Sequence, residues 1–396
     1  MNKPTGISSA QALRDLQDHF NPSKLFAPFI SNERATRARE NHNQRHRRRE
    51  KEIKVKIGHG GTLDPLATGV LITGVGKGTK SLQSFLECTK TYETVVLFGA
   101  ATDTYDRVGK VLKKSPYEHI TREIVEEALG QYRGKFMQLP PLYSALKMNG
   151  KPLYEYAREG KEIPREIERR PVEVLELKLV EWMEGDTHQH KIPTEKAGRA
   201  EISVAEQLWE QEEKLENGKS DLMDNEKALE EFAIRKRKLS DDQDELVSER
   251  PASKRGKKVT PSSQDATMSG GLPVPSDNSP TPQTTPEETP AASTKGPPAA
   301  KLRMTVTSGF YVRSLCHDLG AAVGSAALMA ELVRTRQGEF ELGKNVLEYT
   351  DLKEGEEVWG PKVELMIDSW NEEHRPAARS VTVTDVKTED SDVKEE

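Results

Sequence analysis

The chain has 396 residues, of which 34% are hydrophobic and 31% charged, with a net charge of −6. Its two cysteines, Cys88 and Cys316, form no CxxC pair, which excludes a zinc ribbon or a disulfide framework. The sequence contains no run of 18 apolar residues, no signal-peptide core and no arginine-rich presequence, so we expect a soluble intracellular protein.

The N-terminal part of the chain predicts a helix followed by a basic insertion. Ser8 or Ser9 can cap a helix over residues 7–20, whose apolar residues recur at the spacing of one helix face. Residues 21–53 have little apolar content after Ile30 and carry a series of basic residues, Arg34, Arg37, Arg39, Arg45, Arg47, Arg48, Arg49 and Lys51. We interpret this stretch as a surface insertion with a basic patch; a solvated helix without a partner is the alternative.

Folded core is predicted over residues 54–185. Apolar residues alternate with lysines at 53–57 and indicate a strand, and residues 70–72 read as a buried segment. A short helix is expected at 81–86, and the β-branched and aromatic residues 92–98 are typical of a strand.

The second half of this core predicts one clear helix and one long strand. Thr121 is expected to cap a helix over residues 121–133. Its apolar face would comprise Ile124, Val125, Ala128, Leu129 and Tyr132. The paired prolines 140 and 141 exclude regular structure around them. A short helix is expected at 153–157 and a half-exposed strand at 172–180.

The apolar pattern that is typical of a folded core ends near residue 186 and resumes at Leu302. Residues 251–300 are rich in Pro, Ser, Thr, Lys and Gly and are expected to be disordered. A strand at 304–307 follows, and then a helix with one apolar face made by Leu315, Leu319 and Val323. A second helix is predicted at about 326–334.

The predicted core thus comprises residues 1–20, 54–185 and 301–370, enough for one sizeable domain. Outside it lie the basic insertion, residues 186–300 and an acidic tail at 371–396. Because strands and helices are interspersed and several strands are hairpin candidates, the expected class is α+β with a mixed sheet.

Residues 59–71 read His-Gly-Gly-Thr-Leu-Asp-Pro-Leu-Ala-Thr-Gly-Val-Leu and form the most unusual stretch of the chain. Gly60 and Gly61 permit positive φ and close approach of a ligand. Pro65 disfavours helical geometry at Asp64, so a stiff extended segment would present one carboxylate. An ordinary turn is the alternative interpretation.

Three well-known sequence motifs of functional sites are incomplete or absent in this sequence. The glycine-rich residues 74–79 lack the first glycine of a Walker A loop, where Leu71 stands, and the Ser or Thr, where Gly78 stands. His42 and His46 are one helical turn apart but have no third ligand nearby, so no metal or cofactor is expected. No Gly-x-Ser-x-Gly elbow occurs, which removes support for a serine hydrolase.

Two further residues remain as candidates for chemistry. Tyr92 opens a predicted strand, and Arg313 ends a Gly-Phe-Tyr-Val-Arg segment. Taken alone, each has a simpler interpretation, as a half-buried strand aromatic and as a surface residue at a helix start. The combination with Asp64 is what makes them candidates.

Five blocks, in order, resemble the TruB-type pseudouridine synthases, and within them the eukaryotic enzymes that form pseudouridine 55 in the T-loop of tRNA. The blocks are Lys3–Ser9, His59–Leu71, Lys90–Tyr92, Pro141–Lys147 with Leu153–Arg158, and Ser308–Arg313. They span nearly the whole core and neither large insertion. The resemblance implies a pseudouridine synthase fold, with a mostly antiparallel mixed sheet flanked by helices and a central catalytic cleft.

The same resemblance implies roles for individual residues. Asp64 would be the catalytic aspartate, Tyr92 the ring that stacks on the target base and moves its proton, and Arg313 the partner of Asp64. The RNA-binding residues that it implies are His59, Lys3 and Tyr311. No cofactor and no metal are implied.

The implied reaction fits these residue types. Uracil must leave C1′, turn, and rejoin through C5, and a carboxylate can act as nucleophile or base; the sequence leaves both open. Flipping the base out costs a few kcal/mol, and stacking on an aromatic ring such as Tyr92 recovers roughly 1–3 kcal/mol. Arg313 beside Asp64 would favour the ionised carboxylate.

The chain departs from the family in two places. Members usually have an apolar strand before the Lys-Pro block, whereas this sequence starts at Met1-Asn2, so we expect either that the N-terminus is incomplete or that this edge strand is absent. Bacterial members carry a C-terminal PUA domain, for which residues 350–396 are too few and too acidic. The basic insertion is the candidate replacement for phosphate contacts.

The expected partner is tRNA, through its T-loop, with mRNA as a further candidate; no guide RNA and no membrane are expected, and the protein is expected to be a monomer. Basic clusters at 235–238 and 254–258 have the spacing of a bipartite nuclear import signal. A nuclear location is therefore expected, with mitochondrion and cytoplasm as further candidates. The alternative functions are a guide-RNA-dependent rRNA pseudouridine synthase and a non-catalytic tRNA-binding or folding factor.

Replacing Arg45, Arg47, Arg48 and Arg49 by glutamine is predicted to weaken tRNA binding and to flatten its salt dependence. Each lost phosphate contact reduces the slope of log K against log salt by about 0.9 for a duplex. The measurement is a filter-binding or anisotropy titration between roughly 50 and 200 mM salt. An unchanged slope would contradict the role given to this insertion.

Overall fold

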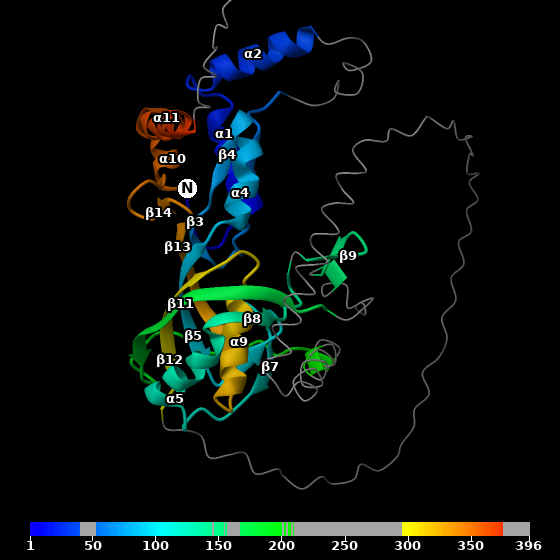
Figure 1. The fold of residues 1–396 in the computed structure, drawn as a ribbon, viewed down its shortest axis with the longest axis vertical. Helices are drawn as coiled ribbons and strands as arrows, with labels where there is room; N and C mark the ends of the chain where they lie inside the picture. The colour runs from blue at the N-terminus through cyan, green and yellow to red at the C-terminus, as the bar shows by residue number, and fades with distance from the viewer. Residues whose placement is uncertain are drawn as a thin grey trace, which may run out of the picture. The chain divides into compact units, whose positions relative to one another are not determined.

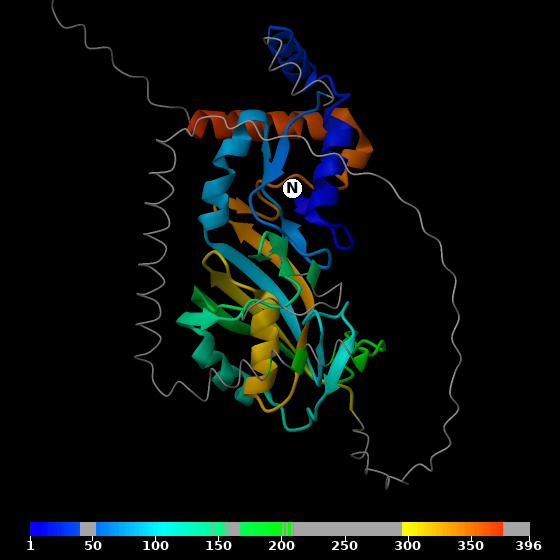
Figure 2. The same cartoon turned by 90° about the vertical axis from the view of Figure 1, so that its right-hand side faces the viewer.

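The computed structural model describes residues 1–39, 53–144, 146–153, 155–156, 167–199 and 295–374, together with residues 202, 205, 206 and 209. These residues form two compact units, labelled by element in Figure 1 and turned by 90° in Figure 2. Unit 1 comprises residues 1–93 and 331–396, and unit 2 comprises residues 94–330. The division falls inside strands β5 (Lys90–Phe98) and β13 (Ala327–Gln337), so each strand contributes residues to both units.

Unit 1 begins with two helices. The N-cap of α1 (Ser9–Phe20) is Ser8, whose hydroxyl accepts a hydrogen bond from the backbone N–H of Gln11 at 3.1 Å. The second helix, α2 (Ala27–Ala38), starts with a proline in its first turn and covers the first part of the predicted basic insertion. Residues 40–52, which carry the remaining arginines of that insertion together with His42 and His46, lie outside the described residues.

Short strands connect the N-terminal and C-terminal parts of unit 1. Its other elements are β1 (Asn2–Lys3), β2 (Ile57–His59), β3 (Thr68–Val70), β4 (Thr73–Val75), the 3₁₀ helix η1 (Gly76–Ser81), α4 (Leu82–Glu87), β14 (Phe340–Glu341), α10 (Asp351–Glu354) and α11 (Glu356–Glu373). β3 pairs antiparallel with β1 and parallel with β13, and β2 pairs antiparallel with β4. The two-residue β1, which includes Lys3 of the Lys-Pro block, lies at one end of the strand order.

Aromatic residues hold α11 against the rest of unit 1. Trp359, 1% exposed, lies 5.0 Å from Phe20 of α1 between ring centroids, and Trp370 lies 5.5 Å from Phe85 of α4. Helices α1, α4 and α11 surround the strands of this unit in Figures 1 and 2. Burial of these large rings stabilises this part of the fold.

Unit 2 is built on the longer strands of the sheet. Its other elements are β6 (Ala100–Thr102), β7 (Val111–Lys114), α5 (Arg122–Ala128), the 3₁₀ helix η2 (Leu129–Tyr132), β8 (Gly134–Gln138), β9 (Lys147–Met148), β10 (Lys151–Pro152), β11 (Arg170–Met183), β12 (Ala299–Val306) and α9 (Val312–Ala322). The strand order here is β13-β5-β12-β11-β8, with β11 antiparallel to both neighbours. Helix α9 lies along one face of these strands in both views.

The predicted α+β class with a mixed, mostly antiparallel sheet is confirmed, as are the helices at α1 and α9 and the strands at β5 and β11. The N-cap at Thr121 is also confirmed, because its side chain accepts from the N–H of Ile124. Among the described residues, no helix is long and apolar enough to cross a bilayer. The predicted domain limits and the predicted disorder of residues 251–300 stay predictions, the latter because those residues lie outside the described part of the chain.

The predicted helix at 326–334 is wrong, because these residues belong to strand β13. Residues Ala327 to Ala330 are all buried, with Leu328 and Ala330 packed in a cluster with Val95 and Leu97 of β5. A short apolar run fits a buried strand as well as a buried helix, and pairing on both sides decides for the strand. Local propensity of Ala, Leu and Met is overridden here by the sheet.

Smaller differences concern element ends. Of the strand expected at 53–57, only Ile57 lies in a strand, at the start of β2. Strand β12 starts at Ala299, before Leu302, where the sequence predicted that the folded core resumes. Helix α5 ends at Ala128 and continues as η2, and Ile124 is 38% exposed rather than buried. Helix α11 continues to Glu373, past the expected start of the tail.

Gly69→Ala is predicted to lower the free energy of unfolding of unit 1 by roughly 2–5 kcal/mol, the sum of left-handed strain and overpacking. Gly69 has φ +106°, and an added Cβ would meet the carbonyl oxygen of Arg334 in the neighbouring strand. Urea unfolding followed by tryptophan fluorescence measures the loss. Gly78→Ala is the control, because nothing lies within 4 Å of its added Cβ; an equal effect of both changes would contradict the close-approach argument.

Candidate active site

Asp64 lies in the loop that joins β2 to β3 in unit 1. The N-terminal end of this loop is fixed where His59 pairs with Thr73 and the N–H of Gly60 donates to the carbonyl of Ile72 at 3.0 Å. Within the loop, the N–H of Ala67 donates to the carbonyl of Asp64 at 3.1 Å, which closes a tight turn over Pro65. The Asp64 side chain is half-exposed. The loop therefore offers one carboxylate to the outside from a fixed backbone.

The N-terminal segment of the chain clamps this loop from one side. The hydroxyl of Ser9 accepts from the N–H of Leu63 at 2.9 Å and donates to its carbonyl at 3.0 Å. The N–H of Gly6 donates to the carbonyl of Pro65 at 2.8 Å, and the hydroxyl of Thr5 to the carbonyl of Leu66 at 2.9 Å. Ser9 is thus unavailable as a helix cap, which is why Ser8 takes that role.

Lys3 lies beneath this clamp and is fully buried. Its ammonium donates to the carbonyls of Pro4 at 2.7 Å and Ile7 at 2.8 Å, and more weakly to that of Pro65 at 3.4 Å. Burial lowers the pKa of Lys3 to about 8, the charge of Asp64 raises it, and the charge of Arg334 lowers it further. That Lys3 lines the site stays a prediction.

Arg334 of β13 holds the loop from the other side. Its side chain is 1% exposed and donates three hydrogen bonds to backbone carbonyls: Nε to Val70 at 2.7 Å, Nη2 to Gly61 at 3.1 Å and Nη1 to Thr62 at 3.5 Å. A guanidinium is suited to this task because its donors are fixed in one plane. Arg334 therefore connects the two ends of the segment that carries Asp64.

Gln337, three residues further along β13, adds a second anchor. It is fully buried, and its Nε2 donates to the carbonyls of Gly60 and, at 2.8 Å, of Phe85. Sequence reasoning missed Arg334 and Gln337 because a helix ending at Arg334 would leave that side chain at the surface. Had residues 327–337 been predicted as a strand beside the Asp64 block, Arg334 and Gln337 would have become candidates for contacts with the loop.

His59 and Tyr92 also belong to unit 1. His59, half-buried at the end of β2, has a pKa lowered by burial and by the charge of Arg334, so the ring is neutral at pH 7. Its Nδ1 is buried without a hydrogen-bond partner. Tyr92 of β5 is 8% exposed and follows Thr91, whose carbonyl accepts from the hydroxyl of Thr335 in β13 at 3.3 Å.

Tyr311 and Arg313 belong to unit 2. Tyr311 is the N-cap residue of α9, and both its backbone groups bond to the buried amide of Gln138, at 2.8 and 3.0 Å. Arg313, 7% exposed, donates to the carbonyls of Thr104 at 2.9 Å and Tyr143 at 3.0 Å. The start of α9 is thus as firmly held as the Asp64 loop.

The structure places four of the six predicted residues, Lys3, His59, Asp64 and Tyr92, in unit 1, and Tyr311 and Arg313 in unit 2. The pairing of Asp64 with Arg313 stays a prediction. Within the described residues, no group of three or more His, Cys, Asp or Glu side chains is placed to hold a metal ion.

Arg334→Lys is predicted to lower kcat for the pseudouridine formation implied by the resemblance about 10- to 100-fold, with a smaller change in KM. A lysine has a single ammonium in place of the planar fork of a guanidinium, so it cannot reach the separate carbonyls of Gly61, Thr62 and Val70 in the same geometry. Misplacing a catalytic group by about 1 Å costs up to about 100-fold. Arg336→Lys is the matched control, because Arg336 bonds to Gly338 and Thr91 rather than to the loop. Equal losses in both variants, measured well below their unfolding temperatures, would contradict a specific positioning role.

Comparison with known proteins identifies the family of this chain. The model of the N-terminal domain of TruB family pseudouridylate synthases matches residues 47–197, and that of the tRNA pseudouridylate synthase B C-terminal domain matches residues 313–366. The chain is 41% identical over 353 residues to tRNA pseudouridine synthase 4 of Schizosaccharomyces pombe, covering 86% of this chain and 78% of that protein.

Two further relatives agree. The chain is 31% identical over 376 residues to tRNA pseudouridine synthase 4 of Saccharomyces cerevisiae, covering 93% and 84% of the two chains. It is 50% identical over 186 residues to tRNA pseudouridine synthase B of Aeromonas salmonicida, covering 47% of each chain. The motif blocks, the family models and these relatives coincide, and the chain belongs to the TruB family of pseudouridine synthases.

Proposed function

We propose that this protein converts uridine 55 in the T-loop of tRNA into pseudouridine without a guide RNA. The observation that carries the proposal is Asp64, a half-exposed carboxylate on a loop whose backbone is held by Ser9, Arg334 and Gln337. A side chain held in this way can meet a reacting carbon without reorganisation of the loop. The names of the two fungal relatives support tRNA as the substrate.

The reaction breaks the C1′–N1 bond of uridine, turns the uracil and forms a C1′–C5 bond, while the C5 proton is lost and N1 gains one. Asp64 either attacks C1′ or takes a proton, and both fit a half-exposed carboxylate. Tyr92 would stack on the flipped uracil, and neutral His59 would contact the everted nucleotide. Arg313 would balance the charge of Asp64.

Further expectations belong to the same proposal. Residues 1–20, 54–185 and 301–370 would form the catalytic domain, acting as a monomer with a central cleft, and Lys3 and Tyr311 would line it. The family models match residues 47–197 and 313–366, so most of the predicted 186–300 insertion lies between them, which supports that assignment. Nuclear location, through the clusters at 235–238 and 254–258, and mRNA as a second substrate stay predictions; those clusters lie outside the described residues.

Asp64→Asn is predicted to abolish pseudouridine formation on a tRNA transcript and to leave tRNA binding largely unchanged. The amide keeps the size of the side chain but cannot act as nucleophile or base. Site-specific detection of pseudouridine, with protein and transcript alone, measures the product at position 55. Thr62→Ser, an exposed change in the same loop, is the control for loop folding.

The alternatives predict different results in that experiment. Product that forms only after a guide RNA is added would support the guide-dependent rRNA enzyme. Tight tRNA binding with no product in the wild-type protein would support the non-catalytic factor. Product at another uridine would refute position 55 while leaving the activity intact.

A further inference from the structure

The loop that joins β6 to β7 contacts helix α9 at two adjacent points. Arg313 and His317 are four residues apart on α9, so their side chains lie on the same face of the helix. Nη1 of Arg313 donates to the carbonyl of Thr104 at 2.9 Å. The ring of Tyr105, the next residue of the loop, lies 4.0 Å from the imidazole of His317 between centroids. One contact therefore holds the guanidinium, and the other holds the loop that supplies its acceptor.

Tyr105 has an unusual backbone conformation. Its φ is +61°, in the left-handed region where bulky residues are uncommon. The φ of a residue sets the orientation of the preceding peptide group, so this angle directs the carbonyl of Thr104. The N–H of Tyr105 donates to the carbonyl of Thr102 at 3.1 Å, and its carbonyl accepts from the N–H of Met329 in β13 at 3.0 Å. Such an outlier persists only where its surroundings hold it, and outliers of this kind are frequent at functional sites.

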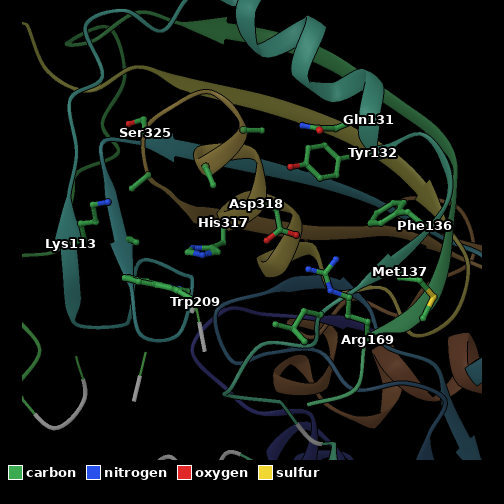
Figure 3. A pocket seen from close by; sticks show the side chains of 15 residues that line it. Lys113, Gln131, Tyr132, Phe136, Met137, Arg169, Trp209, His317, Asp318 and Ser325 are labelled. Carbon is green, nitrogen blue, oxygen red and sulfur yellow. The ribbon is translucent and has the colours of Figure 1, made fainter. Parts of the chain in front are cut away.

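The side chain of Tyr105 adds a further holding contact. Its ring is stacked on that of His317 with an interplanar angle of 3°, and aromatic rings in such contact attract each other. A third ring, that of Trp209, lies 5.7 Å from His317 with an angle of 17°. Figure 3 shows His317 and Trp209 edge-on in the wall of a cavity of about 620 Å³ beside α9. Glycine or asparagine would adopt the left-handed conformation more easily but could not form the stack, which gives a physical reason for a tyrosine here.

His317 enters this stack as a flat, uncharged ring. Burial lowers its pKa to about 4, so the imidazole is neutral near pH 7. A protonated ring one turn away from Arg313 would place two like charges on one helix face, which is unfavourable. Among the described residues, Nδ1 of His317 has no hydrogen-bond partner, so a bond from that atom does not fix the ring. The stack on Tyr105 is therefore the contact that His317 makes with the loop.

We propose that Tyr105 and His317 are positioning residues for Arg313, because their stacked rings keep the carbonyl of Thr104 in place as its acceptor. The guanidinium also donates to the carbonyl of Tyr143 at 3.0 Å, and two separate acceptors fix the plane of its fork where one would not. The inference rests on the role of Arg313 in the proposed function. It adds that the loop between β6 and β7 sets the geometry of that role, without either ring touching the substrate.

The test measures kcat and KM of the full-length protein by tritium release from a tRNA transcript with 5-tritiated uridine, because C5 loses its hydrogen in the reaction. Tyr105→Asn tolerates the left-handed backbone but removes the ring, and His317→Leu removes the other ring. Each is expected to lower kcat about 5- to 50-fold, less than the roughly 100-fold that a misplacement of 1 Å can cost. KM for tRNA is expected to change less than about twofold, because the loss concerns orientation in the transition state and not binding.

Three further variants are the controls. Tyr105→Phe and His317→Phe each keep a flat ring in the stack, and their kcat is expected to stay close to that of the wild-type protein. Phe98→Leu removes a fully buried ring of unit 2, which lies 6.2 Å from Trp182 between centroids. It is expected to lower the unfolding temperature without lowering kcat, provided that all assays are run well below the unfolding temperature of each variant.

Combining Tyr105→Asn with Arg313→Lys tests whether the rings act through Arg313. Arg313→Lys alone is expected to lower kcat, and adding Tyr105→Asn is expected to lower it little further. Residues that act through one group give non-additive effects, whereas a change that acts independently multiplies the loss. Tyr105→Asn carries this test because Tyr105 is half-buried on a loop, so the test does not depend on the folding of His317→Leu.

Wild-type kcat in Tyr105→Asn and His317→Leu, with an impaired Arg313→Lys, would overturn the inference and leave the proposed function intact. The inference is also overturned if the two phenylalanine variants lose as much kcat as Tyr105→Asn and His317→Leu, or if the losses of Tyr105→Asn and Arg313→Lys multiply. An Arg313→Lys variant as active as the wild-type protein would refute the role of Arg313 itself. A wild-type protein that releases no tritium would refute the proposed function and, with it, the inference.

Discussion

The guanidinium of Arg334 donates to the carbonyls of Gly61, Thr62 and Val70, which lie on the two sides of the Asp64 loop. A loop that is rich in glycine has many conformations, and fixing its residues costs conformational entropy. A buried arginine offsets part of that cost because leaving any of its donors unpaired would be worse than keeping the loop in place. The geometry of Asp64 therefore depends on a strand that begins more than 250 residues later in the chain.

The charges around this loop form one coupled set. Arg334 lowers the pKa of His59, Lys3 and Lys90, and burial acts in the same direction on all three. Near pH 7 the imidazole of His59 is therefore neutral, whereas Lys3, with a pKa of about 8, is still mostly protonated and donates to backbone carbonyls. Arg334 thus influences both the backbone of the loop and the protonation of its neighbours.

In both units, irregular backbone segments are held in place by side-chain hydrogen bonds, but the residues that form these bonds differ. In unit 1, Arg334 and Gln337 donate hydrogen bonds to backbone carbonyls of the Asp64 loop. In unit 2, Arg313 donates to the carbonyls of Thr104 and Tyr143. The side chain of Gln138 binds the backbone at the start of α9. In each unit, irregular backbone segments are held by long side chains from regular elements. Such segments need this support because they lack the backbone ladders of helices and strands.

By itself the sequence determined the α+β class, the helices at α1 and α9, the strand β5 and the loop that carries Asp64, because these follow from periodicity, capping and glycine-proline chemistry close along the chain. It failed for residues 326–334, whose Ala, Leu and Met residues suit a helix, and so it missed Arg334 and Gln337. Only the tertiary structure decided these points, since pairing of β13 with β3 and β5 and the convergence of Trp209 with His317 depend on residues far apart in the chain. Contacts between residues so far apart in the chain produce no local sequence pattern from which they could be predicted.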